Sequence, residues 1–90
     1  MKFYSVRDNT AEFFLPPFMA PNDSVAKRMF IGSLGDSFAF RQDFQLYHVG
    51  DFDDQNGLIQ PINPQLILAG HSIAAQLDPR PGVNVQEARQ

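Results

Sequence analysis

A chain of 90 residues with a net charge of −3 is long enough for one domain with a single thin core. It has no cysteine, which excludes disulfides and cysteine-based metal sites and suits a reducing compartment. The longest apolar run, Leu66 to Ala69, is far too short to span a membrane, and the first residues lack the apolar stretch of a secretion signal. Residues 1–45 hold five basic and five acidic side chains, whereas residues 46–90 hold two and five. We therefore expect any polyanionic partner to contact the N-terminal half.

The start of the chain predicts a β-hairpin. Residues 2–7 alternate between two faces, and turn-forming residues at 8–10 separate them from a second apolar run at 13–15. Pro16 and Pro17 cannot donate the hydrogen bonds of a sheet. The second strand should therefore end there or continue as an edge strand.

A helix is predicted over residues 23–34. Either Asn22 or Asp23 can cap its first turn, and Gly35 suits its end. The connector that follows, residues 35–43, has no clear period. Its two phenylalanines either pack down onto the domain or present aromatic rings to a partner, and the sequence leaves both outcomes open.

Residues 44–52 form the clearest predicted strand, apolar on both faces and therefore central in a sheet. A turn at 53–57 contains an Asn-Gly pair, which tolerates positive φ angles well. Residues 58–60 then return as a short strand. Pro61 places that strand at an edge or marks its end.

A second helix is predicted over residues 63–77. Asn63 would be its cap and Pro64 its first helical residue, and the Asp-Pro pair at 78–79 would stop it. The expected fold is α+β in ββαββα order, with about four antiparallel or mixed strands and two helices. One domain would cover residues 1–77, followed by an extended or disordered tail at 78–90. Exposed sheet edges and surplus aromatic residues in so small a chain predict a homodimer.

The acidic residues near position 51 raise the question of a metal site. Asp51 and Asp53 begin like a calcium-binding loop, but Asn56 stands where the loop needs glycine and Ile62 where it needs glutamate. Solvent-facing turn residues are the favoured interpretation. No metal or cofactor is expected.

The other residues with catalytic potential do not form a recognisable site. His48 and His71 have no third ligand at a zinc-like spacing, so each is expected to be a core or interface histidine. The chain has no nucleophile elbow and no glycine-rich phosphate loop. We do not expect an enzyme.

Two non-enzymatic functions remain. Aromatic side chains beside basic ones can stack on bases and contact phosphates without sequence preference, although a pI near 5.0 is low for a nucleic-acid-binding domain. The net acidity and the apolar connector favour a protein-interaction module instead. The candidate nucleic-acid-binding residues are Lys2, Tyr4, Arg7, Lys27, Arg28, Phe38, Phe40 and Arg41.

The most distinctive stretch is residues 46–57, LYHVGDFDDQNG, followed by Ile-Asn-Pro at 62–64. It resembles the small nonstructural protein of gokushovirus-type microviruses, which are tailless icosahedral phages with circular single-stranded DNA. Residues 1–8, 14–18 and 22–28 are similar to the first strand, the apolar segment and the helix entry of that family, in the same order. The similarity extends to about residue 75.

This resemblance implies a function. Proteins of that family are absent from the mature virion and are assigned a role in single-stranded DNA synthesis or in the switch from replication to packaging, in some cases as DNA-binding proteins. The implied partners are single-stranded viral DNA and viral replication or assembly proteins, in the cytoplasm of the bacterial host. The alternative is a non-enzymatic module that binds a viral replication or assembly protein or a host factor.

Overall fold

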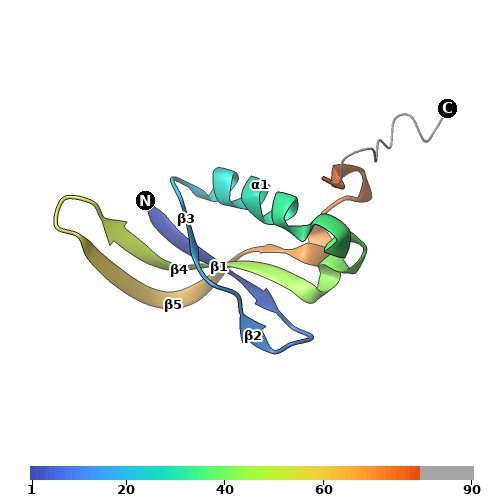
Figure 1. Cartoon of the computed structure of the whole chain (residues 1–90), viewed down its shortest axis with the longest axis horizontal. Helices are drawn as coiled ribbons and strands as arrows, with labels where there is room; N and C mark the ends of the chain where they lie inside the picture. Colours follow the sequence, from blue (N-terminus) through green and yellow to red (C-terminus); the bar gives the residue numbers. More distant parts are fainter. Residues whose placement is uncertain (80–90) are drawn as a thin grey trace.

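The computed structural model describes residues 1–79, so most of the tail predicted at 78–90 lies outside the described residues. One α-helix packs on one face of a curled antiparallel sheet (Figure 1). The strands are β1 (Lys2–Asp8), β2 (Phe13–Phe14), β3 (Phe18–Ala20), β4 (Phe44–Asp53) and β5 (Leu58–Ala69). The helix α1 (Asp23–Leu34) and the 3-10 segments η1 (Gly35–Asp43), η2 (Gly70–Ser72) and η3 (Ala75–Leu77) complete the order. No helix within residues 1–79 is both long and apolar enough to cross a bilayer.

The sheet order is β2-β1-β4-β5, and β3 also pairs with β1. The strand β4 occupies one edge of β1. On the opposite edge of β1, β2 and β3 lie one after the other. Arg7 pairs with Phe14 on β2, and Tyr4 pairs with Phe18 on β3. Between these two pairs, the segment that joins β2 to β3 has one residue more than β1. The predicted N-terminal hairpin is confirmed, and its second strand continues past Pro16 as an edge.

The local sequence signals predicted α1 correctly. The Asn22 side chain accepts a hydrogen bond from the Val25 N–H at 2.9 Å, which satisfies one of the free donors of the first turn. Gly35 follows the last helical residue with a φ of +50°, a conformation that favours glycine. The helix buries Ala26, Phe30 and Leu34.

The predicted ββαββα fold with two helices is wrong. Residues 58–69 form one long edge strand, β5, and only short 3-10 turns follow it. His48 pairs with Gln65 and Gly50 with Pro61, so two extra residues of β5 bulge out between these pairs. The bulge contains Asn63 and Pro64. Proline has no backbone N–H to donate. On the outer side of an edge strand such as β5 the N–H groups have no partner strand, so prolines are tolerated there.

The core lies between α1 and the sheet. Tyr4, Val6 and Leu46 pack with the buried face of the helix. At one end of this layer, Phe38 from η1 and Ile73 after η2 are also buried. The sequence could not place the two phenylalanines of the connector, and the structure separates them: Phe38 is 3% exposed and Phe40 is 60% exposed.

Candidate nucleic-acid interface

The two faces of the sheet differ in what covers them. Side chains alternate along a strand, and residues paired across antiparallel strands share a face. The face that carries Tyr4, Val6 and Leu46 lies under α1, the one α-helix of the described residues (Figure 1). We call the opposite side the open face. Its residues, from the alternation and the register, are Phe3, Ser5, Arg7, Phe14, Met19, Gln45, Tyr47, Val49, Gly50, Phe52, Ile59, Pro61, Leu66 and Ala69.

Three side chains of the open face form what we call the Arg7 cluster. The Arg7 guanidinium lies 5.4 Å from the centre of the Phe14 ring, a cation–π distance. The Tyr47 ring meets the same phenylalanine edge-on, with ring centres 5.4 Å apart. Phe14 remains 41% exposed. A base could therefore stack on this cluster without any opening of the core.

Charge is unevenly divided between the two faces. Arg7 is the one charged side chain that the strands of the described region place on the open face. The carboxylates of β4 lie on the helix-covered side: Asp51 pairs with Lys2, and Asp53 pairs with Leu58. Although the protein has a net charge of −3, no strand carboxylate lies on its open face, so this face does not repel a phosphate backbone through its strands.

An open groove of roughly 520 Å³ borders the Arg7 cluster. Its lining includes Phe14, Pro16, Pro17, Val49 and Pro64. The buried Ser5 hydroxyl lies at its floor and donates to the Leu15 carbonyl at 2.6 Å. The groove is thus almost wholly apolar, so it suits flat rings better than a charged group.

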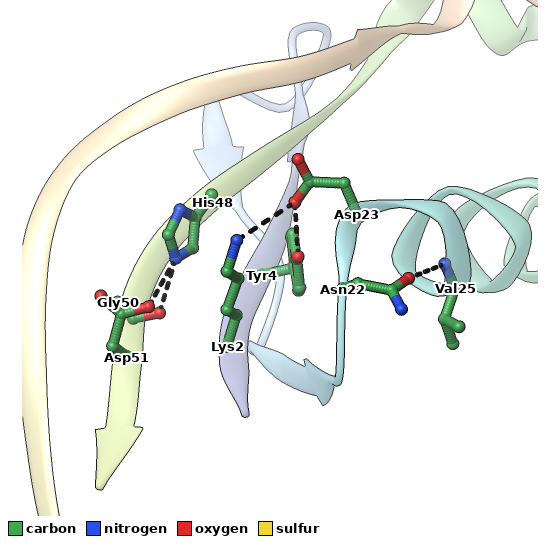
Figure 2. Close-up of polar contacts among 8 residues, drawn as sticks. All are labelled: Lys2, Tyr4, Asn22, Asp23, Val25, His48, Gly50 and Asp51. Atoms are coloured by element: carbon green, nitrogen blue, oxygen red, sulfur yellow. Dashed lines mark hydrogen bonds and ion pairs between the residues drawn. The ribbon is translucent and has the colours of Figure 1, made fainter.

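The helix-covered side carries a polar network where β1, β4 and the start of α1 meet (Figure 2). Tyr4 donates its hydroxyl to Asp23 at 2.6 Å, and the Lys2 ammonium lies 3.9 Å from the same carboxylate oxygen. Hydrogen bonding from Tyr4, with a smaller contribution from Lys2, holds the pKa of Asp23 below its usual range. Burial and the Asp23 hydrogen bond raise the pKa of the Tyr4 phenol. The network therefore keeps both groups in their ordinary charge states.

His48 is buried beside this network. Its Nε2 atom lies 2.9 Å from both the Gly50 carbonyl oxygen and an Asp51 carboxylate oxygen (Figure 2). Because both partners are acceptors, Nε2 must carry a proton. The interpretation of His48 as a core histidine is confirmed, whereas His71 is exposed in η2.

The acidic turn is held by its own backbone. Asp53 accepts hydrogen bonds from the backbone N–H groups of Gln55 and Asn56 and from the Asn56 amide. These bonds lower the pKa of Asp53. Within residues 1–79, no three His, Cys, Asp or Glu side chains are grouped so as to hold a metal ion.

The sequence-derived candidates do not come together in one place. Tyr4 and Phe38 are buried and cannot stack on a base in this fold. Arg41 lies 4.7 Å over the Phe38 ring and donates to the Ile73 carbonyl at 2.8 Å, so it links η1 to the segment after η2. Exposed candidates away from the open face are Lys2, Lys27, Arg28 and Phe40.

Arg7 is the one candidate that the structure places on the open face. Sequence reasoning missed Phe14 and Tyr47, its two aromatic neighbours. Phe14 could have been found from the predicted hairpin, because a turn at residues 8–10 brings Phe14 close to Arg7. Tyr47 could not be paired with either from sequence, because the neighbour of β1 across the sheet depends on a contact over about 40 residues.

These features define a small helix-on-sheet domain with an exposed aromatic face in its described part. Residues 1–73 match the family described as Phage ORF5 protein, and the chain belongs to that family. It is therefore a bacteriophage protein. Neither a curated protein nor a solved structure was found to match it.

Proposed function

We propose that this chain is a nonstructural protein of a microvirus-type phage that binds single-stranded viral DNA in the host cytoplasm, during replication or the switch to packaging. The Arg7 cluster carries this proposal. An arginine over an exposed phenylalanine, with a tyrosine beside it, gives a sequence-tolerant stacking platform for unpaired bases. Membership of a phage protein family and the similarity of residues 46–57 to the gokushovirus protein support the same function.

The electrostatics set the expected strength of binding. A platform with one cation neutralises about one phosphate, so the logarithm of the binding constant should fall with the logarithm of salt at a slope of roughly −0.7. Stacking supplies the remaining affinity. Binding should therefore be weak and only mildly dependent on salt.

A fluorescence-anisotropy titration with labelled oligothymidine at low salt tests this proposal. Phe14→Ala should weaken binding by roughly 5- to 150-fold, because a stacked base contributes about 1–3 kcal/mol. Phe13→Ala is the matched control: Phe13 is 54% exposed on the same strand but points to the other side, so its removal should leave binding unchanged. Absence of binding by the unmodified protein at tens of micromolar would refute direct DNA contact.

A second variant set separates the open face from the connector. Phe40 is the most exposed aromatic side chain of the sequence-derived candidates. If Phe40→Ala weakens binding and Phe14→Ala does not, the DNA site lies on η1 and α1 instead.

The alternative function is a protein-interaction module that binds a viral replication or assembly protein or a host factor. The apolar lining of the 520 Å³ groove favours it. Val49→Lys distinguishes the two functions, because Val49 lines the groove. A lysine there should strengthen DNA binding by adding a cation and should weaken the docking of an apolar peptide.

A further inference from the structure

The turn that joins β4 to β5 contains an asparagine followed by a glycine, Asn56 and Gly57, at the outer end of the hairpin (Figure 1). Both residues are exposed, and Gly57 has a φ of +72°. An asparagine is most prone to deamidation before a glycine, because no side chain on the next residue hinders the approach of its backbone nitrogen. Local sequence and exposure thus both indicate that Asn56 is chemically reactive.

Deamidation at this pair consists of an attack by the Gly57 backbone nitrogen on the side-chain carbonyl carbon of Asn56. The nitrogen gives its proton to a base in the solvent, and the new C–N bond closes a succinimide ring. The bond from the same carbon to the side-chain nitrogen breaks, and that nitrogen takes up a proton from water and leaves as ammonia. Water then opens the ring, which leaves an aspartate or an isoaspartate. The only co-reactant is water.

The folded turn holds both groups that would react. The Gly57 N–H donates to the Asp53 carbonyl at 2.8 Å, so removal of its proton would leave two electron-rich atoms facing each other. The side-chain amide of Asn56 donates to the Asp53 carboxylate at 2.8 Å, which restricts the rotation that the attack requires. The negative charge of this carboxylate also opposes the negative charge that develops on the Asn56 amide oxygen during the attack.

From these contacts we infer that Asn56 is a deamidation site that the folded turn protects, with the Asp53 carboxylate as the protecting group. The carboxylate is itself fixed, because the backbone N–H groups of Gln55 and Asn56 donate to it at 3.0 and 3.2 Å. These bonds hold the pKa of Asp53 below its usual range, so it stays charged in the mildly alkaline solutions that favour deamidation. No residue of the Arg7 cluster takes part, and the inference is independent of DNA binding.

Peptide mass spectrometry of protein aged at mildly alkaline pH tests this inference. In the folded, unmodified chain Asn56 should convert slowly. Asp53→Ala should speed the conversion several-fold, because it removes the side-chain bonds and leaves the backbone bond from Gly57 in place. Asp54→Ala is the matched control: Asp54 is the exposed neighbour with the same charge, and no side-chain hydrogen bond of Asp54 is found within residues 1–79. Its loss should leave the rate unchanged.

Further comparisons separate the effect of the fold from that of the local sequence. In concentrated urea the turn is lost, so the unmodified chain and Asp53→Ala should convert at the same high rate. Asn63 is an internal control, because it is exposed but the nitrogen of Pro64 carries no hydrogen and cannot close the ring. If circular dichroism shows that Asp53→Ala is unfolded, Asp53→Asn replaces it. That variant keeps an acceptor oxygen for the turn but loses the charge, and it should convert at an intermediate rate.

Three outcomes would overturn the inference. The first is an equal rate of Asn56 conversion in the folded unmodified chain and in the folded Asp53 variant. The second is an equal acceleration by Asp54→Ala, which would show that only the charge of the turn matters. The third is a difference between the unmodified chain and Asp53→Ala that persists in urea, which would assign the effect to the local sequence instead of the folded turn.

Discussion

Tyr4 donates its hydroxyl to Asp23 at 2.6 Å and thereby joins the middle of β1 to the first residue of α1. The tyrosine ring is fully buried and stacks near Phe18 with ring centres 5.9 Å apart. Asp23 also places a negative charge in the first turn of the helix, where the helix dipole favours it. This bond therefore helps to hold the start of the helix over β1.

Tyr4→Phe should lower the free energy of unfolding at neutral pH by about 1–2 kcal/mol, because it removes a hydrogen bond to a charged acceptor and keeps the ring. Urea denaturation followed by circular dichroism would measure the loss. Tyr47→Phe is the control: the Tyr47 hydroxyl donates to the Gln45 amide oxygen at a longer 3.2 Å. An equal loss in both variants would show that the bond to Asp23 has no special role.

Stability should decline at both extremes of pH. The lowered pKa values of Asp23 and Asp53 contribute stability that is fully present above their unfolded values of about 4 and is lost as the pH falls below that. The raised pKa of Tyr4 contributes stability that is fully present below about pH 10 and is lost as the pH rises above it. Urea titrations across this range would show both declines. Above about pH 10, Tyr4→Phe should lose stability less steeply than the unmodified chain.

The elements with strong local signals were predictable. Asn22, Gly35 and the spacing of the apolar residues between them specify α1 within a dozen residues, and the structure gives the same bounds. The segment after residue 62 has equally strong local signals, yet it forms a strand. Its Asn-Pro pair fits a helix start in isolation, and only pairing with β4 shows that the pair lies in a bulge. Such pairing between distant segments outweighs local propensity.

The same limit applies to the candidate site. Alternation along β1 separated Phe3 and Ser5 from Tyr4 and Val6, but it could not say which face α1 would cover. Tyr4 and Phe38 were therefore chosen as candidates although both lie in the core. Basic residues were easier to place, because Lys27 and Arg28 had to lie on the solvent side of an amphipathic helix.

Gly70 is a position where any larger residue should disrupt the fold. A Cβ atom at this position would lie 1.6 Å from the Arg41 carbonyl oxygen and 2.6 Å from that of Phe44. Since both obstacles are backbone atoms, Gly70→Ala should cost about 3 kcal/mol or more in the free energy of unfolding. Gly32 in α1 has nothing within 4 Å of such an atom, so Gly32→Ala should stabilise by roughly 0.5–1 kcal/mol. Glycine-to-alanine substitution should therefore lower the Tm at Gly70 and raise it at Gly32 in thermal unfolding.

The two asparagines that precede predicted helices give the sharpest test of the corrected fold. Asn22 caps α1 through its hydrogen bond with the Val25 N–H, so Asn22→Ala should cost about 1 kcal/mol in urea denaturation. Asn63 is exposed in the bulge of β5, and no side-chain hydrogen bond of Asn63 is found within residues 1–79. Asn63→Ala should therefore change the free energy of unfolding by less than about 0.5 kcal/mol. A loss at Asn63 as large as that at Asn22 would favour a capped helix at residues 63–77 and contradict the long edge strand.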